Sequence, residues 1–105
     1  MDVVVLNQCE KELKTFPDDI LGKVADAVAK LRDDQTLSMP LSRSMPPPLG
    51  RGVHELRFRD RSGQYRVIYL LKVRDAIYLV HAFKKKSQTT PKKHIDVAIK
   101  RIKSL

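Results

Sequence analysis

The sequence contains a single cysteine, only four glycines, no tryptophan and no apolar run long enough to cross a membrane. Because Cys9 is alone, an intramolecular disulfide and a cysteine-rich zinc site are excluded, and we expect Cys9 to be a small core residue. The glycines are widely separated, so the sequence has no glycine-rich phosphate loop. The first residues lack the basic and apolar segments of a signal peptide. We therefore expect a soluble, cytoplasmic protein that has no contact with a membrane.

Carboxylates are scarce after residue 36. This part of the chain contains only four, on different predicted elements: Glu55, Asp60, Asp75 and Asp96. Two-metal nucleases need carboxylates that converge on ions about 4 Å apart. The three histidines of the chain also lack the spacing of metal ligands. We therefore expect neither a metal site nor a bound cofactor.

Positive charge is abundant, and it is unevenly distributed along the chain. The formal net charge is +9. Residues 1–36 hold five Lys/Arg against eight Asp/Glu, a net charge of −3, whereas the later residues hold 16 against four, a net charge of +12. A charge carried only for solubility would not be expected to segregate in this way. The asymmetry favours a polyanionic partner, most simply nucleic acid.

The hydrophobic pattern predicts one α+β domain that spans residues 1–105. A β-branched segment at 2–6 predicts a strand, and helical spacing at 8–16 and 17–32 predicts an α-hairpin. The prolines and glycines of residues 37–52 predict a loop.

Later in the chain, apolar alternation at 53–59 and apolar runs at 67–71 and 77–80 predict an antiparallel meander with strands at 53–59, 64–72 and 76–83. Turns are expected at 60–63 and 73–75. Thr90 as the cap and Pro91 in the first turn predict a C-terminal helix that ends near Lys103. We expect the helices to cover one face of the sheet and to leave the face with Arg57 and Arg59 open to a ligand.

One segment concentrates reactive and charged side chains: His81-Ala-Phe-Lys-Lys-Lys-Ser-Gln-Thr-Thr-Pro-Lys-Lys93. Lysines, an imidazole and a phenyl ring at the end of a strand suit a ligand that carries both phosphates and bases. The alternative interpretation is a solvated lysine turn.

RNA cleavage is a reaction that these residue types can support. The 2′-hydroxyl of RNA can attack the adjacent phosphate, so the protein need supply neither a nucleophile nor a metal. Arg57, Arg59 and Arg66 are candidates to bind and neutralise the phosphate. His81 is a candidate to exchange protons near neutral pH. A lysine among Lys84–Lys86 is a second candidate if neighbouring charges lower its pKa.

Structural roles are the alternatives for the same residues. His81 shares the strand parity of Ile77 and Leu79, which is typical of a core histidine. Arg57 can pair with the cross-strand neighbours of Glu55. His94 falls in the first turn of the last helix, where a surface position is expected.

Three blocks of sequence resemble a known family. They are Leu49-Gly-Arg-Gly-Val-His-Glu-Leu-Arg-Phe-Arg-Asp60, Ser62-Gly-Gln-Tyr-Arg-Val-Ile-Tyr69 and His81-Ala-Phe-Lys-Lys-Lys-Ser-Gln-Thr-Thr-Pro91. Together they are similar to the HigB-like, phage-derived branch of the RelE/ParE superfamily, the toxins of bacterial type II toxin–antitoxin modules. The similarity covers nearly the whole chain. It departs from the family pattern at His54, where an aromatic residue is more usual, and in the proline run Pro46–Pro48.

The resemblance implies a RelE-like fold, with an antiparallel sheet, an N-terminal α-hairpin and a C-terminal helix packed on the sheet. It also implies a metal-independent, ribosome-dependent mRNA endonuclease that inhibits translation. The implied partners are the ribosome, mRNA and a cognate helix-turn-helix antitoxin, through which alone operator DNA would be bound. The implied catalytic residues are Arg57, Arg66, His81, Lys84 and Lys86. The implied RNA- and ribosome-binding residues are Arg59, Lys85, Lys92 and Lys93.

Two other activities fit the same fold and charge. The superfamily also contains inhibitors of DNA gyrase, and a non-catalytic nucleic-acid-binding module would use the same basic surface. The His-Ala-Phe-Lys-Lys block favours the ribonuclease branch.

Overall fold

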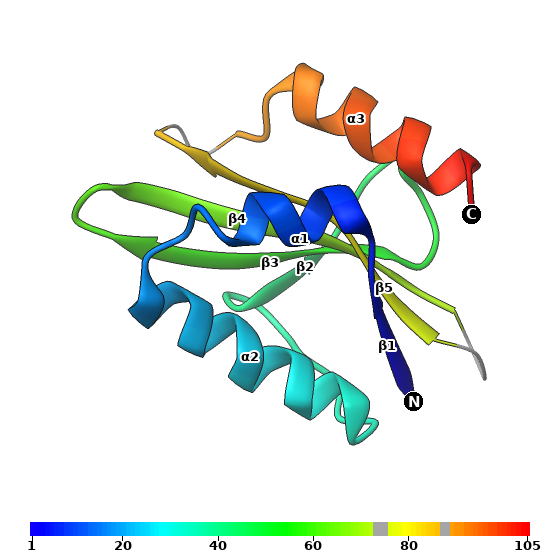
Figure 1. Ribbon diagram of the computed structural model, residues 1–105. Helices are drawn as coiled ribbons and strands as arrows, with labels where there is room; N and C mark the ends of the chain where they lie inside the picture. The colour runs from blue at the N-terminus through cyan, green and yellow to red at the C-terminus, as the bar shows by residue number, and fades with distance from the viewer. Residues whose placement is uncertain (73–75, 87–88) are drawn as a thin grey trace.

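The computed structural model describes residues 1–72, 76–86 and 89–105. The elements follow one another in the order β1 (Asp2–Val5), α1 (Asn7–Leu13), α2 (Asp18–Arg32), β2 (Ser42–Ser44), β3 (Val53–Asp60), β4 (Gly63–Leu71), β5 (Ala76–Lys85) and α3 (Lys92–Lys103). The predicted α-hairpin, meander and C-terminal helix are present, and the α+β class is confirmed (Figure 1). The turn predicted at 73–75 lies outside the described residues.

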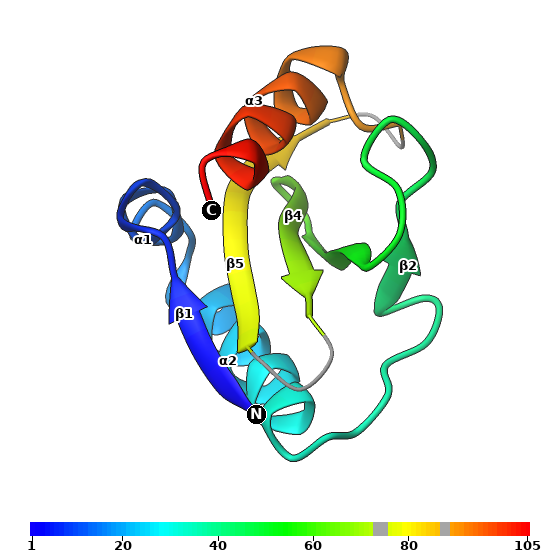
Figure 2. The same cartoon turned by 90° about the vertical axis from the view of Figure 1, so that its right-hand side faces the viewer.

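Within the described residues, the strands form a five-stranded mixed sheet in the order β1-β5-β4-β3-β2. Strands β3, β4 and β5 pair antiparallel, as predicted, whereas β1 pairs parallel with β5. Helix α1 continues from β1 and contacts β5 (Figure 2). Strand β1 therefore lies beside the first half of β5, and helix α1 lies beside the part that follows.

Strand β2 corrects the prediction that residues 37–52 form only a loop. Ser42–Ser44 pairs antiparallel with His54–Leu56 of β3. This strand is three residues long and polar, so it has no hydrophobic alternation to reveal it in the sequence.

The helices cover both faces of the sheet, so the prediction that they share one face is wrong. Side chains alternate along β4, and Val67 packs in the core cluster that includes α2 residues. Ile68 points to the opposite face, where it belongs to a second cluster with Ala98 of α3. Figure 1 shows α2 and α3 on opposite sides of the strands. Both faces of β4 and β5 carry apolar side chains, and each face therefore requires its own covering layer.

A β-bulge in β5 moves His81 away from the face that its parity predicted. Leu79 pairs with Tyr69, but His81 pairs with Ile68, so Val80 is an extra residue between them. Leu79 therefore packs toward the α2 layer, while His81 lies on the α3 face with Phe83. The expectation that His81 shares the face of Ile77 and Leu79 is wrong for this reason.

The start of α3 also differs from the prediction. Pro91 occupies the N-cap position, and no side chain caps the helix. The Thr90 hydroxyl instead donates a hydrogen bond to Glu55 Oε2 at 2.7 Å. Strand β5 extends two residues beyond the predicted end, so Lys84 and Lys85 are strand residues that point to opposite faces.

Among the described residues, no helix has both the length and the apolar composition needed to cross a membrane.

Candidate nucleic-acid interface

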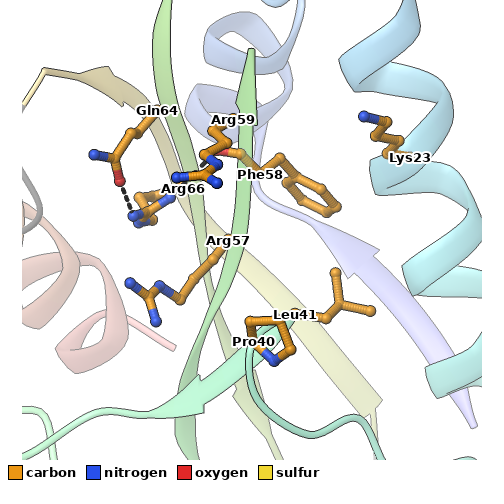
Figure 3. A pocket seen from close by; sticks show the side chains of 8 residues that line it. All are labelled: Lys23, Pro40, Leu41, Arg57, Phe58, Arg59, Gln64 and Arg66. Carbon is orange, nitrogen blue, oxygen red and sulfur yellow. Dashed lines mark hydrogen bonds between the residues drawn. The ribbon is translucent and has the colours of Figure 1, made fainter.

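A surface cavity of about 480 Å³ lies at the outer edge of β3. It is lined by Lys23, Pro40, Leu41, Arg57, Phe58, Arg59, Gln64 and Arg66 (Figure 3). Among the residues that the structure describes, this lining contains four cationic side chains and no carboxylate. Such a cavity attracts anions, and several cations close together can bind successive phosphates of a nucleic acid.

The path of β3 creates this cavity. Strand β2 pairs only with residues 54–56 of β3, so the outer edge of β3 from Phe58 onward borders the cavity. Arg57 and Arg59 extend from one side of the strand and Phe58 from the other, while Lys23 reaches toward the cavity from α2 (Figure 3). The sheet alternation therefore places two arginines side by side on one face.

Arg66 is buried at the inner wall of the cavity. Arg66 is 2% exposed and its Nε lies 3.5 Å from Oε1 of Glu55, which is 1% exposed. Its NH1 group donates hydrogen bonds to the carbonyl oxygens of Phe58 and Tyr65 at 3.3 and 3.2 Å, and its NH2 group donates to Gln64. Arg66 is therefore both a fixed positive charge and the partner of a buried carboxylate.

Glu55 is the centre of a buried polar network. It accepts the Thr90 hydrogen bond, and Arg43 NH2 lies 3.8 Å from its Oε1. Thr90 in turn accepts a hydrogen bond from Lys85 Nζ at 3.3 Å. Burial lowers the pKa of Lys85 to about 8; the Glu55 charge opposes this shift and the surrounding arginines add to it. Lys85 is thus able to give up a proton near neutral pH.

His81 lies in a second buried cluster, beside the edge of β5. Its Nδ1 atom lies 2.9 Å from Oε1 of Glu12 on α1, and its Nε2 atom lies 2.8 Å from Nδ1 of His94 on α3. The Glu12 carboxylate also accepts hydrogen bonds from the Ala82 backbone N–H at 3.1 Å and from both terminal nitrogens of Arg101, at 2.7 and 3.1 Å. Burial lowers the pKa of His81, an effect that Glu12 opposes.

The structure brings together only some of the predicted residues. Arg57, Arg59 and Arg66 meet at the cavity, and Lys86 borders the neighbouring hollow beside the β3–β4 turn. Lys84 lies on the opposite face of β5, with its Nζ 5.6 Å from the centre of the Tyr65 ring.

The predicted cations on α3 are exposed. Lys92 is 90% exposed and pairs with Asp96 at 3.6 Å, and Lys93 is also exposed. The structure places both on the helix surface rather than in the cavity lining.

Sequence reasoning missed several residues of these sites, among them Lys23, Gln64, Glu12 and His94. Lys23 and Glu12 belong to the acidic part of the chain, and no local signal points to their roles. A signal for His94 is present in the sequence, because this residue directly follows the charged segment 81–93. The sequence analysis nevertheless predicts a surface position for it. Glu12 and Arg101 meet only through the fold, since 89 residues separate them.

Two other features bear on the chemistry. No group of three or more His, Cys, Asp or Glu side chains in the described ranges is arranged to hold a metal ion. Cys9 is buried in the core, as predicted, and burial raises the pKa of its thiol to about 12. Its sulfur is therefore not a nucleophile at neutral pH.

Known structures first identify the class of fold. The chain is similar to a chain of the toxin–antitoxin complex RelBE2 from Mycobacterium tuberculosis, with a TM-score of 0.57 and 15% sequence identity. The match covers 80% of this chain and 96% of that one. At this identity the likeness establishes the fold, and the predicted RelE-like architecture is confirmed.

The sequence then identifies the family. Residues 11–103 match the family described as phage-derived protein Gp49-like (DUF891). The chain therefore belongs to this family, which confirms the resemblance to the phage-derived branch. No curated protein matches the chain in sequence.

Proposed function

We propose that this chain is the toxin of a type II toxin–antitoxin module, and that it inhibits translation by cutting mRNA on the ribosome. The observation that carries the proposal is the cavity at the edge of β3, with Lys23, Arg57, Arg59 and Arg66 in its lining. Four cations around one space suit a phosphodiester whose negative charge grows as a fifth oxygen approaches phosphorus.

The proposed reaction is attack by the 2′-hydroxyl of the RNA on its own adjacent phosphate. Arg57 and Arg59 bind phosphate oxygens, and Arg66 supplies a fixed positive charge. Arg57 Nε is a buried donor without a hydrogen-bond partner in the described part of the chain, so an anion nearby would stabilise this side chain. Lys85 is the proton donor, since its pKa of about 8 leaves it protonated but acidic at neutral pH.

An antitoxin is the second proposed partner. The RelBE2 chain belongs to a toxin–antitoxin complex, and its fold matches this one. We propose that a helix-turn-helix antitoxin covers the basic surface with an acidic segment and that operator DNA is bound only through it. The charge of +12 carried after residue 36 supports an acidic partner.

Growth arrest upon induction in bacteria tests the function. Under this proposal, mapped mRNA 5′ ends accumulate at defined positions within coding sequences soon after induction. An inhibitor of DNA gyrase would instead produce DNA damage, and a simple binding module would produce neither result.

Arg57→Ala is expected to reduce mRNA cleavage by about 30-fold, because one lost arginine–phosphate contact costs about 2 kcal/mol. The matched control is Arg32→Ala, which removes the same charge from an exposed position in the last turn of α2. Both variants are to be compared at equal expression, by primer extension on one reporter mRNA. Equal cleavage by the two variants would exclude Arg57 from the site.

Binding to ribosomes programmed with mRNA is expected to weaken steeply with salt. Four cationic contacts to a single strand predict a slope of about −3 in a plot of log affinity against log salt concentration. Arg57→Ala should make this slope shallower by about 0.7, and Arg32→Ala should leave it unchanged. A flat salt dependence of the native protein would exclude the cavity as the docking surface.

A further inference from the structure

We propose that His94 is the base that removes the 2′-hydroxyl proton, and that Glu12 and His81 position it through a chain of hydrogen bonds. The proposal rests on the RNA cleavage proposed above and names the group that initiates it. No local signal in the sequence points to Glu12, and His94 is expected from the sequence to lie at the surface.

The hydrogen bonds join α1 to two elements that are distant from it in sequence, β5 and α3. They run from Oε1 of Glu12 on α1 to Nδ1 of His81 on β5 at 2.9 Å, and from Nε2 of His81 to Nδ1 of His94 on α3 at 2.8 Å. His81 is 4% exposed, whereas His94 is only half-buried. His94 is therefore the more exposed of the two imidazoles.

The hydrogen-bond partners determine which nitrogens carry protons. The Glu12 carboxylate can only accept hydrogen bonds, so the Nδ1–H of His81 donates to it. His81 Nε2 then carries a lone pair, and the Nδ1–H of His94 donates to that lone pair. This arrangement leaves the lone pair of His94 on Nε2, the atom needed to accept a proton from a substrate.

Burial, with Arg101 adding to it, disfavours a second proton on His81. The NH1 group of Arg101 lies 3.3 Å from His81 Nδ1 and donates to Glu12 and to the Val80 carbonyl oxygen, at 2.7 and 3.0 Å. A fixed guanidinium beside the imidazole disfavours the imidazolium form. Glu12 therefore orients the neutral His81 ring. Its negative charge also stabilises the positive charge that appears when His94 accepts a proton.

His94 lies next to the row of side chains that leads to the cavity. Its ring stacks on Phe83, with ring centres 3.9 Å apart and planes at 11°. Phe83 is the strand neighbour of Arg66, and Arg66 is the strand neighbour of Arg57. Lys85 lies two residues beyond Phe83 on the same face of β5. The base therefore contacts the Phe83 ring, and the proposed proton donor lies two residues from Phe83 on the same face of β5.

The proton and bond changes balance without a further reactant. His94 Nε2 takes the 2′-hydroxyl proton as the 2′ oxygen bonds to phosphorus. The bond between phosphorus and the 5′ oxygen then breaks, and this oxygen takes a proton from the Lys85 ammonium group. The products are a 2′,3′-cyclic phosphate and a 5′-hydroxyl. Solvent later returns a proton to Lys85 and removes one from His94.

The charges around the two groups set the expected pH profile. His94 faces His81 and Lys85 of β5, Glu12 of α1 and Lys93 of its own helix. Lys85 faces Glu55 and Arg57 of β3, Arg66 of β4 and Arg43 of β2. Burial, with His81 next, lowers the pKa of His94 to about 4, so the base is unprotonated throughout the neutral range. Because Lys85 must be protonated to act, cleavage should fall as the pH rises through about 8.

The test uses purified full-length protein and ribosomes programmed with a defined mRNA. His94→Ala is expected to slow cleavage by about 10²–10⁴-fold, the usual contribution of a general base, while ribosome binding is retained. Added imidazole should restore part of the rate. His94→Asn serves as a second variant, because its amide can still donate to His81 but offers no base. His54→Ala is the histidine control, since His54 lies on the other face of β3 beside Tyr69.

The positioning role has a separate readout. Glu12→Gln should lower kcat for cleavage without raising KM, and it should have no further effect when combined with His94→Ala. An equal loss in both backgrounds would show that Glu12 acts only through the fold and would overturn its positioning role. Native-like cleavage by His94→Ala and His94→Asn would overturn the base while leaving the proposed function intact. Absence of cleavage by the native protein would overturn both.

Discussion

Replacing the 2′-hydroxyl by hydrogen at the nucleotide on the 5′ side of the cut is expected to abolish cleavage. In the proposed mechanism this hydroxyl is the nucleophile, and the side chains at the cavity provide only charge and proton transfer. The measurement uses programmed ribosomes and an mRNA with one deoxynucleotide. Binding should be unchanged, because the phosphates proposed to bind Arg57 and Arg59 are retained.

The matched control places the deoxynucleotide on the 3′ side of the same cut. That mRNA should be cleaved at the native rate, since its 2′-hydroxyl takes no part in the reaction. Cleavage of the first mRNA at the native rate would mean that water or a protein group attacks the phosphate.

Arg66→Ala is expected to lower the free energy of unfolding by about 3–5 kcal/mol, the usual cost of breaking a buried ion pair. The reason is that Glu55, which is 1% exposed, would lose the guanidinium that lies 3.5 Å from it. Urea denaturation measures the loss, and Arg59→Ala is the control because Arg59 is exposed.

The double variant Glu55→Met with Arg66→Met should recover much of the lost stability, because it removes both charges together. A loss below about 1 kcal/mol in Arg66→Ala would show that Glu55 finds sufficient compensation in Thr90 and Arg43. Because Arg66 has this structural role, loss of toxicity in Arg66→Ala would not by itself identify a catalytic residue. Arg57 is the more informative position.

The sequence was sufficient to predict the meander and the cationic surface. Alternating apolar residues define β3 and place Arg57 and Arg59 on the same face, while a continuous apolar run marks β4. These features depend on local periodicity, which is visible in a single sequence.

The face of His81 was not predictable in the same way. A bulge at Val80 reverses the parity of every later residue in β5, and no glycine or proline marks its position. The same bulge brings Phe83 and Lys85 to the face that carries Arg57 and Arg66. A one-residue irregularity therefore determines which of the three consecutive lysines joins the buried network.

The ion pairs that position the candidate site are also hidden in the sequence. In the sequence, Glu12 is one of several acidic residues on the N-terminal helices, and nothing distinguishes it from the others. In the structure it accepts a hydrogen bond from Arg101, 89 residues later. Thr90 looked like a helix cap, but its hydroxyl bonds to Glu55, 35 residues earlier. Such pairings follow from tertiary packing, in which a buried charge must find a partner wherever the fold supplies one.

The chemical nature of the cut ends tests the central claim most directly. Native protein is to be incubated with programmed ribosomes, and the ends of the cleaved mRNA determined by mass spectrometry. Attack by the 2′-hydroxyl predicts a 2′,3′-cyclic phosphate, or the 3′-phosphate formed from it, and a 5′-hydroxyl. Products that end in a 3′-hydroxyl and a 5′-phosphate would contradict the account, because they require a nucleophile other than the RNA itself.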